Sequence, residues 1–270
     1  MTAVDDLPDV WVEALEGYVQ WMNAANRSRG TVRLHRHYVS HVARCAPSPA
    51  GVTASDLEGL LGNPTWKDET RKSARSVMIV FFRWCRQAGY VKSSPARRLP
   101  KVTVGAGVPK PAPQDVFDDA FRRGSEDQRT MLLLARYAGL RCCEIAAVRG
   151  VDLDGDMLHV VGKGRKHRVV PIVHAGLVAT IRATPGYLFP GGDGGHVGAD
   201  WVSRQLGRLL PGEWTAHKLR HAYASRAYAN GADIYAIAQA LGHSRLETTQ
   251  RYTQMPMDNL RRVSQAAEFA

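Results

Sequence analysis

The chain contains 270 residues, of which 44% are hydrophobic and 23% are charged, a composition typical of folded globular proteins and not of disordered chains. No stretch approaches the ~20 apolar residues of a membrane span, and the acidic start MTAVDDLPD differs from a secretory signal, so we expect neither a membrane protein nor export. The four cysteines show no CxxC spacing, so we expect a reducing compartment and neither zinc ribbons nor disulfides.

The charge is unevenly distributed along the chain. Lysine and arginine outnumber the acidic residues by 36 to 25, which gives a net charge of +11. Residues 17–55 contain five arginines and no acidic residue, and residues 70–114 contain ten basic residues and again no acidic one. Because solvated helix faces usually mix both signs, these segments indicate a polyanionic partner, and nucleic acid is favoured over an anionic membrane surface.

Apolar periodicity predicts four helices in the first hundred residues, at 8–24, 29–45, 54–61 and 70–88. At 100° per residue, the second and fourth helices each carry basic residues on one side and apolar residues on the other. The apolar side of the second helix holds Leu34, Tyr38, Val42 and Cys45. We expect the basic sides to contact DNA, through Arg29, Arg33, Arg36 and Arg44 on the second helix and Arg71, Arg75, Arg83 and Arg86 on the fourth.

The rest of the chain predicts a linker and a second domain. Four prolines and two glycines in residues 99–113 indicate an interdomain linker, so the domains are expected at 1–98 and 114–270, the latter ending in a C-terminal tail. In the second domain we expect a β-hairpin, Met157–Val161 and His167–Ile172, around a basic turn, and a surface loop at Gly191–Gly198. The expected helices lie at 114–123, 127–138, 142–148, 175–183, 199–210, 216–229, 233–240 and 246–254.

Four short motifs follow one another in the second domain. They are Tyr137-Ala-Gly-Leu-Arg141-Cys-Cys-Glu144, Gly162-Lys163-Gly164, Thr215-Ala-His217-Lys-Leu-Arg220-His221, and Leu241-Gly-His243 followed nine residues later by Tyr252. In this order they resemble the tyrosine recombinase (phage integrase) family, and the N-terminal half resembles the helical core-binding domain of that family. The resemblance implies a mainly α-helical protein: a SAM-like core-binding domain, then an α+β catalytic domain of the DNA breaking-rejoining type with a small antiparallel sheet.

The chemistry of that family suits these residue types. Attack on a DNA phosphodiester gathers negative charge at phosphorus, and two guanidiniums, here Arg141 and Arg220, can bind the non-bridging oxygens and stay charged. The resemblance implies that Tyr252 is the nucleophile, which forms a 3′-phosphotyrosyl bond and frees a 5′-hydroxyl. It also implies that Lys163 is the general acid and that His217 and His243 bind the same phosphate, His217 also accepting the tyrosine proton. Glu144 is expected to orient the arginines and His217.

The resemblance also sets expectations for cofactors and partners. We expect no metal and no cofactor, because the motifs contain no acidic cluster of the kind that two-metal nucleases use. The expected partners are double-stranded DNA core (attachment) sites, three further copies of the chain at a Holliday junction, and accessory proteins of a host or phage. The expected location is the bacterial cytoplasm, in association with the nucleoid. The start of the chain is expected either of a compact form without an N-terminal arm-binding domain or of a truncated chain.

Three functions besides phage integration and excision remain open at this stage. Phage integration and excision is the main hypothesis, and a Xer-type chromosome dimer resolvase also fits a compact chain. A topoisomerase-like nickase of type IB would use similar chemistry without partner exchange. A helix-turn-helix regulator would account for Ile234–Tyr252, a helix, glycine turn and helix, and for the basic charge, but it leaves Arg141, Lys163 and His217 without a role.

Overall fold

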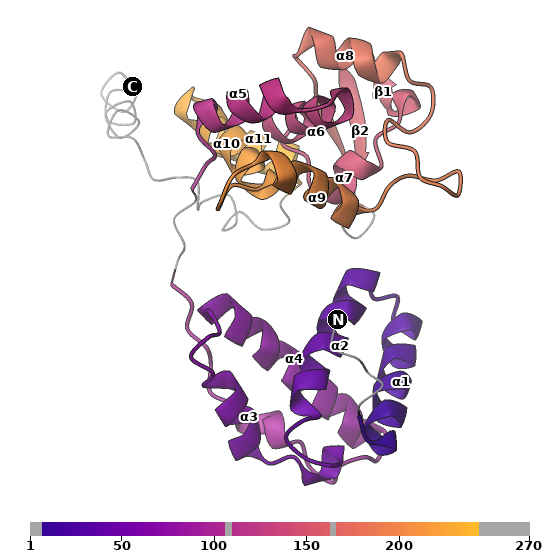
Figure 1. The fold of residues 1–270 in the computed structure, drawn as a ribbon, viewed down its shortest axis with the longest axis vertical. Helices are drawn as coiled ribbons and strands as arrows, with labels where there is room; N and C mark the ends of the chain where they lie inside the picture. Colours follow the sequence, from indigo (N-terminus) through magenta and orange to yellow (C-terminus); the bar gives the residue numbers. More distant parts are fainter. Residues whose placement is uncertain (1–6, 106–109, 163–165, 243–270) are drawn as a thin grey trace, which may run out of the picture. The chain divides into compact units, whose positions relative to one another are not determined.

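The computed structural model describes residues 7–105, 110–162 and 166–242. The chain forms two compact units, Met1–Gly105 and Ala106–Ala270 (Figure 1). We call them the N-terminal and C-terminal units and describe each by itself. The division falls inside the segment 99–113 that the sequence indicates as a linker.

The N-terminal unit is helical. Local capping accounts for where its helices begin: Ser28 Oγ accepts the N–H of Thr31, and Thr53 and Asp56 form a reciprocal capping box. The helix bounds agree with the predicted ones to within about one turn. The helices are α1 (Asp9–Ala24), α2 (Arg29–Val42), α3 (Ala54–Leu61) and α4 (Asp68–Gln87), with short 3₁₀ helices η2 (Pro49–Gly51) and η3 (Pro95–Arg98).

Aromatic side chains from α1 and α4 form the centre of the N-terminal core. Trp11 stacks on Phe81 with ring centroids 6.0 Å apart, and Tyr18 meets the same ring edge-on at 5.1 Å. One prediction for α2 is wrong: Leu34, expected on its apolar face, is 42% exposed. The reason is that the buried stripe of α2 begins only one turn later, at Tyr38.

The C-terminal unit surrounds α6 (Glu126–Tyr137), which contacts the helices α5, α7, α8, α9 and α10. Its three-stranded antiparallel sheet has the order β1-β2-β3 and contains the predicted hairpin; the two-residue β1 was not predicted. The predicted helix at 246–254 lies outside the described residues. The other elements are α5 (Gln114–Arg123), α7 (Cys142–Ala146), η4 (Gly150–Asp152), β1 (Leu153–Asp154), β2 (Met157–Val161), β3 (His167–Pro171), α8 (Ala175–Arg182), α9 (Ala199–Leu209), α10 (Ala216–Ala229) and α11 (Ile234–Leu241).

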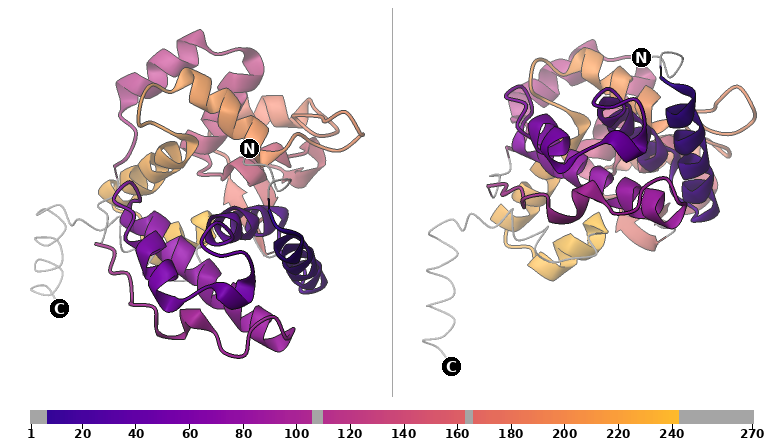
Figure 2. Two further views of the ribbon diagram at one scale, coloured as in Figure 1. Left: turned by 60° about the horizontal axis from the view of Figure 1, so that its bottom comes forward. Right: turned by 90° about the horizontal axis from the view of Figure 1, so that it is seen from below.

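The sheet has one buried and one exposed face. Leu158 and Val160 of β2 and Val170 of β3 are buried against the helices, and the residues between them are exposed. The long connection between α8 and α9 projects from the unit in every view (Figures 1 and 2), and Gly191–Gly198 lie in it, as the sequence predicts. All four cysteines are free. Within the described residues, no helix is long and apolar enough to cross a membrane.

Candidate active site

The turn between α6 and α7 requires a glycine. Gly139 has a φ of +61°, and a Cβ at this position would lie 2.8 Å from Cδ1 of Tyr223. After this turn, the backbone N–H of Arg141 donates to Oε2 of Glu144 at 2.8 Å, which satisfies one of the free N–H groups at the start of α7. The carboxylate of Glu144 therefore lies directly beneath Arg141.

Glu144 is the only acidic residue that is buried among those the structure describes, and its side chain has no exposed surface. Arg168 donates from Nη1 to Oε1 and from Nη2 to Oε2, both at 2.8 Å, and Nη1 of Arg141 donates to Oε1 at 2.9 Å. Nη1 of Arg220 lies 3.7 Å from Oε2. Burial alone would raise the pKa of Glu144, but the hydrogen bonds from Arg168 and from the backbone of Arg141 outweigh it and hold the pKa below its ordinary value. One carboxylate thus supports three guanidiniums, and the cluster carries two positive charges in excess.

Arg168 is the member of this cluster that the sequence analysis missed. It stands opposite Val160 in the hairpin and shares the inward face of β3 with Val170. Its Nε donates to the carbonyl of Ala240, near the end of α11, at 2.8 Å. A charged residue at an inward strand position requires a buried counter-charge. A basic residue at an inward strand position was therefore the sequence signal for a buried ion pair, and Glu144 is its partner.

Arg220, on α10, is 1% exposed and donates to the carbonyls of Gly139 and Leu241. Nη2 of Arg141 lies 3.5 Å from the carbonyl of Gly242. Arg168 binds the carbonyl of Ala240, so the three arginines contact three successive carbonyls at the C-terminal end of α11. Helix C-terminal carbonyls lack partners within the helix and favour positive charge, so this end of α11 stabilises the cluster.

His217 lies on α10 one turn before Arg220, where part of its surface is exposed and part is covered. Its pKa is below the ordinary value, chiefly because the ring is partly withdrawn from water and also because the cationic Arg220 and Arg141 lie nearby. The ring meets that of His221 at a steep angle, with centroids 4.3 Å apart. A neutral imidazole beside two guanidiniums is suited to accept a proton at neutral pH.

The structure therefore brings together four of the predicted site residues, Arg141, Glu144, His217 and Arg220. The other three, Lys163, His243 and Tyr252, lie outside the described residues. Two of them directly follow glycines that the structure does describe, and both glycines lie against the cluster. A Cβ on Gly162, the residue before Lys163, would lie 3.2 Å from Oε1 of Glu144, and a Cβ on Gly242, the residue before His243, would lie 3.1 Å from Cδ of Arg168.

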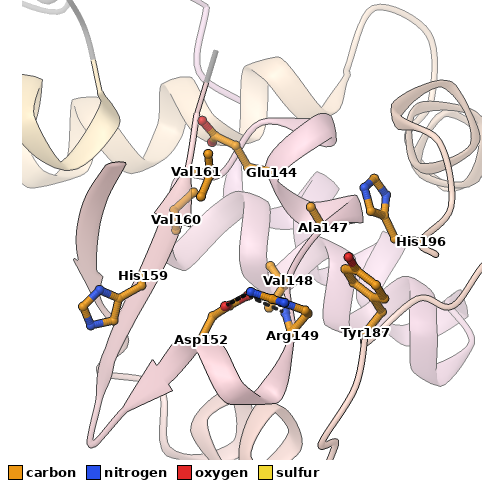
Figure 3. Close-up of a pocket in the computed structure, with 10 residues that line it drawn as sticks. All are labelled: Glu144, Ala147, Val148, Arg149, Asp152, His159, Val160, Val161, Tyr187 and His196. Atoms are coloured by element: carbon orange, nitrogen blue, oxygen red, sulfur yellow. Dashed lines mark hydrogen bonds and ion pairs between the residues drawn. The ribbon is translucent and has the colours of Figure 1, made fainter. Parts of the chain in front are cut away.

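A cavity of about 240 Å³ adjoins this cluster. Figure 3 shows Glu144 near one end of it and the ion pair of Arg149 with Asp152 at the other, with Tyr187 and His196 along one side. Nη2 of Arg149 lies 2.7 Å from Asp152 Oδ1, and the guanidinium also lies over the ring of Tyr187. In the part of the chain that the structure describes, no group of three or more histidine, cysteine or acidic side chains is arranged to hold a metal ion.

The eight arginines predicted to contact DNA fall into two groups. Arg71 and Arg75, on α4, are partly buried. Arg71 donates to the carbonyl of Asn63, and Arg75 donates to the carbonyls of Leu99 and Pro100, so both also stabilise the N-terminal unit. The contact of all eight with DNA stays a prediction. The exposed group consists of Arg29, Arg33, Arg36, Arg44, Arg83 and Arg86.

Comparisons with known proteins identify the family and the fold of the chain. The model of the phage integrase family matches residues 117–258. The tyrosine recombinase XerC of Rhodospirillum centenum is 29% identical over 96% of this chain and 87% of its own length. Two structures of lambda integrase, both 16% identical, share the fold. A dimer bound to a COC′ core site matches with a TM-score of 0.71 over 89% of this chain and 94% of that one, and a tetramer bound to a Holliday junction with 0.67 over 86% and 77%.

Proposed function

Because the chain belongs to the phage integrase family and is a site-specific tyrosine recombinase, an enzyme that breaks and rejoins DNA, we propose that the scissile phosphate binds at the arginines around Glu144. The observation that carries this proposal is the sharing of one buried carboxylate by Arg141, Arg168 and Arg220. The positive charge in excess at this point matches the negative charge that gathers on a five-coordinate phosphorus.

Arg141 and Arg220 are the phosphate ligands in this proposal. The side chain of Arg141 is 30% exposed, and its Nη2 lies at a long 3.5 Å from the carbonyl of Gly242. Arg141 can therefore turn to a phosphate oxygen without breaking its bond to Glu144. Arg220 is buried, and its two terminal nitrogens bind carbonyls. Arg220 must therefore exchange the carbonyl of Leu241 for a phosphate oxygen, a step that couples substrate binding to the end of α11.

The covalent step follows from the motifs. The Oη of Tyr252 forms a bond to phosphorus while the bond from phosphorus to O5′ breaks, and a 3′-phosphotyrosyl linkage results. His217 accepts the phenol proton, Lys163 gives a proton to the departing O5′, and His243 hydrogen-bonds to a non-bridging oxygen. Since the new linkage conserves the energy of the phosphodiester, the reverse reaction with another 5′-hydroxyl rejoins DNA without ATP. The lowered pKa of His217 supports its part as the base.

DNA recognition is proposed to involve both units. The exposed arginines of α2 and α4 bind backbone phosphates of a double-stranded core site, and four copies of the chain join two such sites through a Holliday junction. The lambda integrase tetramer, which shares the fold of this chain, supports this arrangement. Host or phage accessory proteins and a location at the bacterial nucleoid, in the cytoplasm, complete the proposal.

Two host processes suit such an enzyme. We favour the integration and excision of a phage or another mobile element. Chromosome dimer resolution is the second candidate, because the XerC relative aligns over 96% of this chain. Mapping the covalently trapped DNA in the host separates them: a mobile element gives sites at both of its ends, whereas dimer resolution gives one chromosomal site.

The experiment that tests the chemistry uses a nicked suicide substrate, from which the cleaved strand diffuses away. Wild-type protein is expected to form a covalent adduct with the DNA, and Tyr252→Phe is expected to bind the same DNA without one. Peptide mapping should place the adduct on Tyr252, and sequencing the trapped DNA gives the target site. If the wild type binds its own site but never forms an adduct, the proposed function fails.

A further inference from the structure

Arg168 differs from Arg141 in its exposure to solvent and from Arg220 in its bonds to Glu144, because Nη1 of Arg220 lies 3.7 Å from Oε2 of that carboxylate. Its side chain is 7% exposed, whereas that of Arg141 is 30% exposed. All three guanidinium nitrogens have acceptors: Nη1 and Nη2 bind the two oxygens of Glu144, and Nε binds the carbonyl of Ala240. Arg168 therefore acts on the reaction through its neighbours or not at all.

The charges show what Arg168 supplies. Without it, the carboxylate of Glu144 would have Arg141 as its closest ion-pair partner at 2.9 Å, with Arg220 at 3.7 Å. The negative charge would then cancel much of the positive field that Arg141 directs outward, because charges a few ångströms apart interact strongly away from water. The parallel bonds from Arg168 are the most favourable geometry for an arginine with a carboxylate, so Arg168 takes up most of the charge of Glu144.

The backbone around Arg168 holds the pair in place. Gly242 has a φ of +63°, and a Cβ there would lie 3.1 Å from Cδ of Arg168. On the other side, a Cβ on Gly162 would lie 3.3 Å from Nη1 of Arg168. The side chain thus lies between two close backbone segments, which fixes its orientation toward Glu144.

From these contacts we infer that Arg168 is a positioning residue for phosphoryl transfer. It neutralises and orients Glu144, so that the charges of Arg141 and Arg220 remain available to the phosphate in the transition state. Arg168 itself does not touch the DNA. This inference rests on the proposed function and adds a residue that the motifs of the chain do not contain.

The test compares two substrates with Arg168→Gln, which removes the charge of Arg168 but keeps a hydrogen-bonding side chain. One suicide substrate carries the normal phosphate at the cleavage site, and the other carries an uncharged methylphosphonate there. On phosphate, we expect Arg168→Gln to lower the single-turnover cleavage rate at saturating protein by about a hundredfold, the size of effect found when one donor to a transition-state anion is removed. On methylphosphonate, which develops less negative charge, the loss should be at least several times smaller.

Arg168→Lys is the second variant, and Arg149→Gln is the matched control. Lysine restores the positive charge, so Arg168→Lys should cleave phosphate faster than Arg168→Gln even if it remains below the wild type. Arg149 forms a similar two-bond pair with Asp152 away from the arginine cluster, so Arg149→Gln should cleave both substrates at the wild-type rate. DNA affinity should be unchanged in all three variants. Urea unfolding of the full chain identifies a variant that is unfolded, and the comparison then uses the folded Arg168 variant.

The outcomes separate this inference from the proposed function. Equal losses on phosphate and methylphosphonate would overturn the inference, because a purely structural role lowers both rates alike. An Arg168→Lys rate no better than that of Arg168→Gln would also overturn it. If instead the wild type forms no adduct with the phosphate substrate, the proposed function itself fails.

Discussion

The two units of the molecule use arginine in opposite ways. In the N-terminal unit, Arg33 and Arg36 lie exposed on α2, and the core beneath them is formed by apolar and aromatic side chains. In the C-terminal unit, Arg168 and Arg220 point inward, where Glu144 and the carbonyls at the end of α11 receive them. All buried charged residues among those described belong to the C-terminal unit. The difference teaches that the number of arginines in a segment does not by itself identify a DNA contact. An exposed arginine can reach a phosphate from the surface, whereas a buried arginine needs acceptors that the fold already provides.

The largest expected effect is a loss of stability on removing the carboxylate charge of Glu144, with which Arg141, Arg168 and Arg220 are paired. Glu144→Gln leaves Arg141, Arg168 and Arg220 without their common carboxylate, and removal of one partner from a buried ion pair costs about 3 kcal/mol or more. Urea unfolding of the full chain measures this loss in the free energy of unfolding. Asp152→Asn, at the exposed pair with Arg149, is the control and should change it little. Equal losses in the two variants would mean that burial does not distinguish the pairs.

A smaller effect is expected from the backbone that supplies an acceptor to Arg220. Gly139→Ala combines a strained positive φ with a contact of 2.8 Å to Tyr223, whereas Gly155→Ala has a similar φ of +59° and open space around it. We expect about 1 kcal/mol of destabilisation from strain in Gly155→Ala and about 1–3 kcal/mol more in Gly139→Ala, because of overpacking. Unfolding curves of the two variants give the difference directly. The absence of any difference would refute the close packing at Gly139.

The exposed arginines are expected to affect binding and not stability. The double variant Arg33→Glu/Arg36→Glu should weaken DNA affinity about tenfold or more at moderate salt. It should also flatten the log–log salt dependence by about 0.9 for each phosphate that the variant no longer neutralises. A titration of labelled core-site DNA at several salt concentrations measures both quantities. Glu13→Gln and Glu16→Gln on α1 serve as controls for surface changes. Unchanged affinity in the double variant would exclude this face of α2 from the DNA interface.

The smallest expected effect is a shift along the pH axis. Since the pKa of His217 in the folded chain lies below its ordinary 6.5, the neutral ring is favoured by folding. The contribution of His217 to stability is therefore complete above pH 6.5 and is lost as the pH falls through the folded-state pKa. The acid limb of the cleavage rate at subsaturating protein, which reports the free enzyme, should accordingly lie below pH 6.5, and His217→Gln should abolish that limb. An acid limb above pH 6.5 in the wild type would contradict the environment described for His217.

Periodicity and motif order account for most of what could be predicted from the sequence. The mainly helical fold with a small antiparallel sheet is confirmed. It could be predicted because the apolar spacing, the cap at Thr53 and the hairpin around Gly162 are signals that lie within short stretches of the sequence. The association of Arg141, Glu144, His217 and Arg220 followed from the order of the motifs. Tertiary contacts decided the rest. Whether Leu34 is covered depends on which turn of α2 meets its neighbours, and the carbonyls that Arg75 binds lie 24 and 25 residues away in the chain.

Arg168 shows most clearly that the partners of a residue cannot be predicted from neighbouring residues in the sequence. In the strand His167–Pro171 it resembles one more basic residue beside a basic turn, and the sequence has no acidic residue between Asp156 and Asp193. Its partners come from α7 and α11, 24 and 72 residues away. Strand alternation could have shown that Arg168 points inward, but only the fold identifies its counter-charge.

Single-turnover cleavage at saturating protein tests the central claim, that inward-facing arginines serve the chemistry and outward-facing ones serve binding. With all DNA bound, Arg33→Glu/Arg36→Glu should cleave at the wild-type rate, whereas Arg220→Ala, assayed where it remains folded, should be slower by a factor of about a hundred or more, equivalent to about 3 kcal/mol of transition-state stabilisation. If both variants cleave at the same fraction of the wild-type rate, the division of labour between the two units is contradicted.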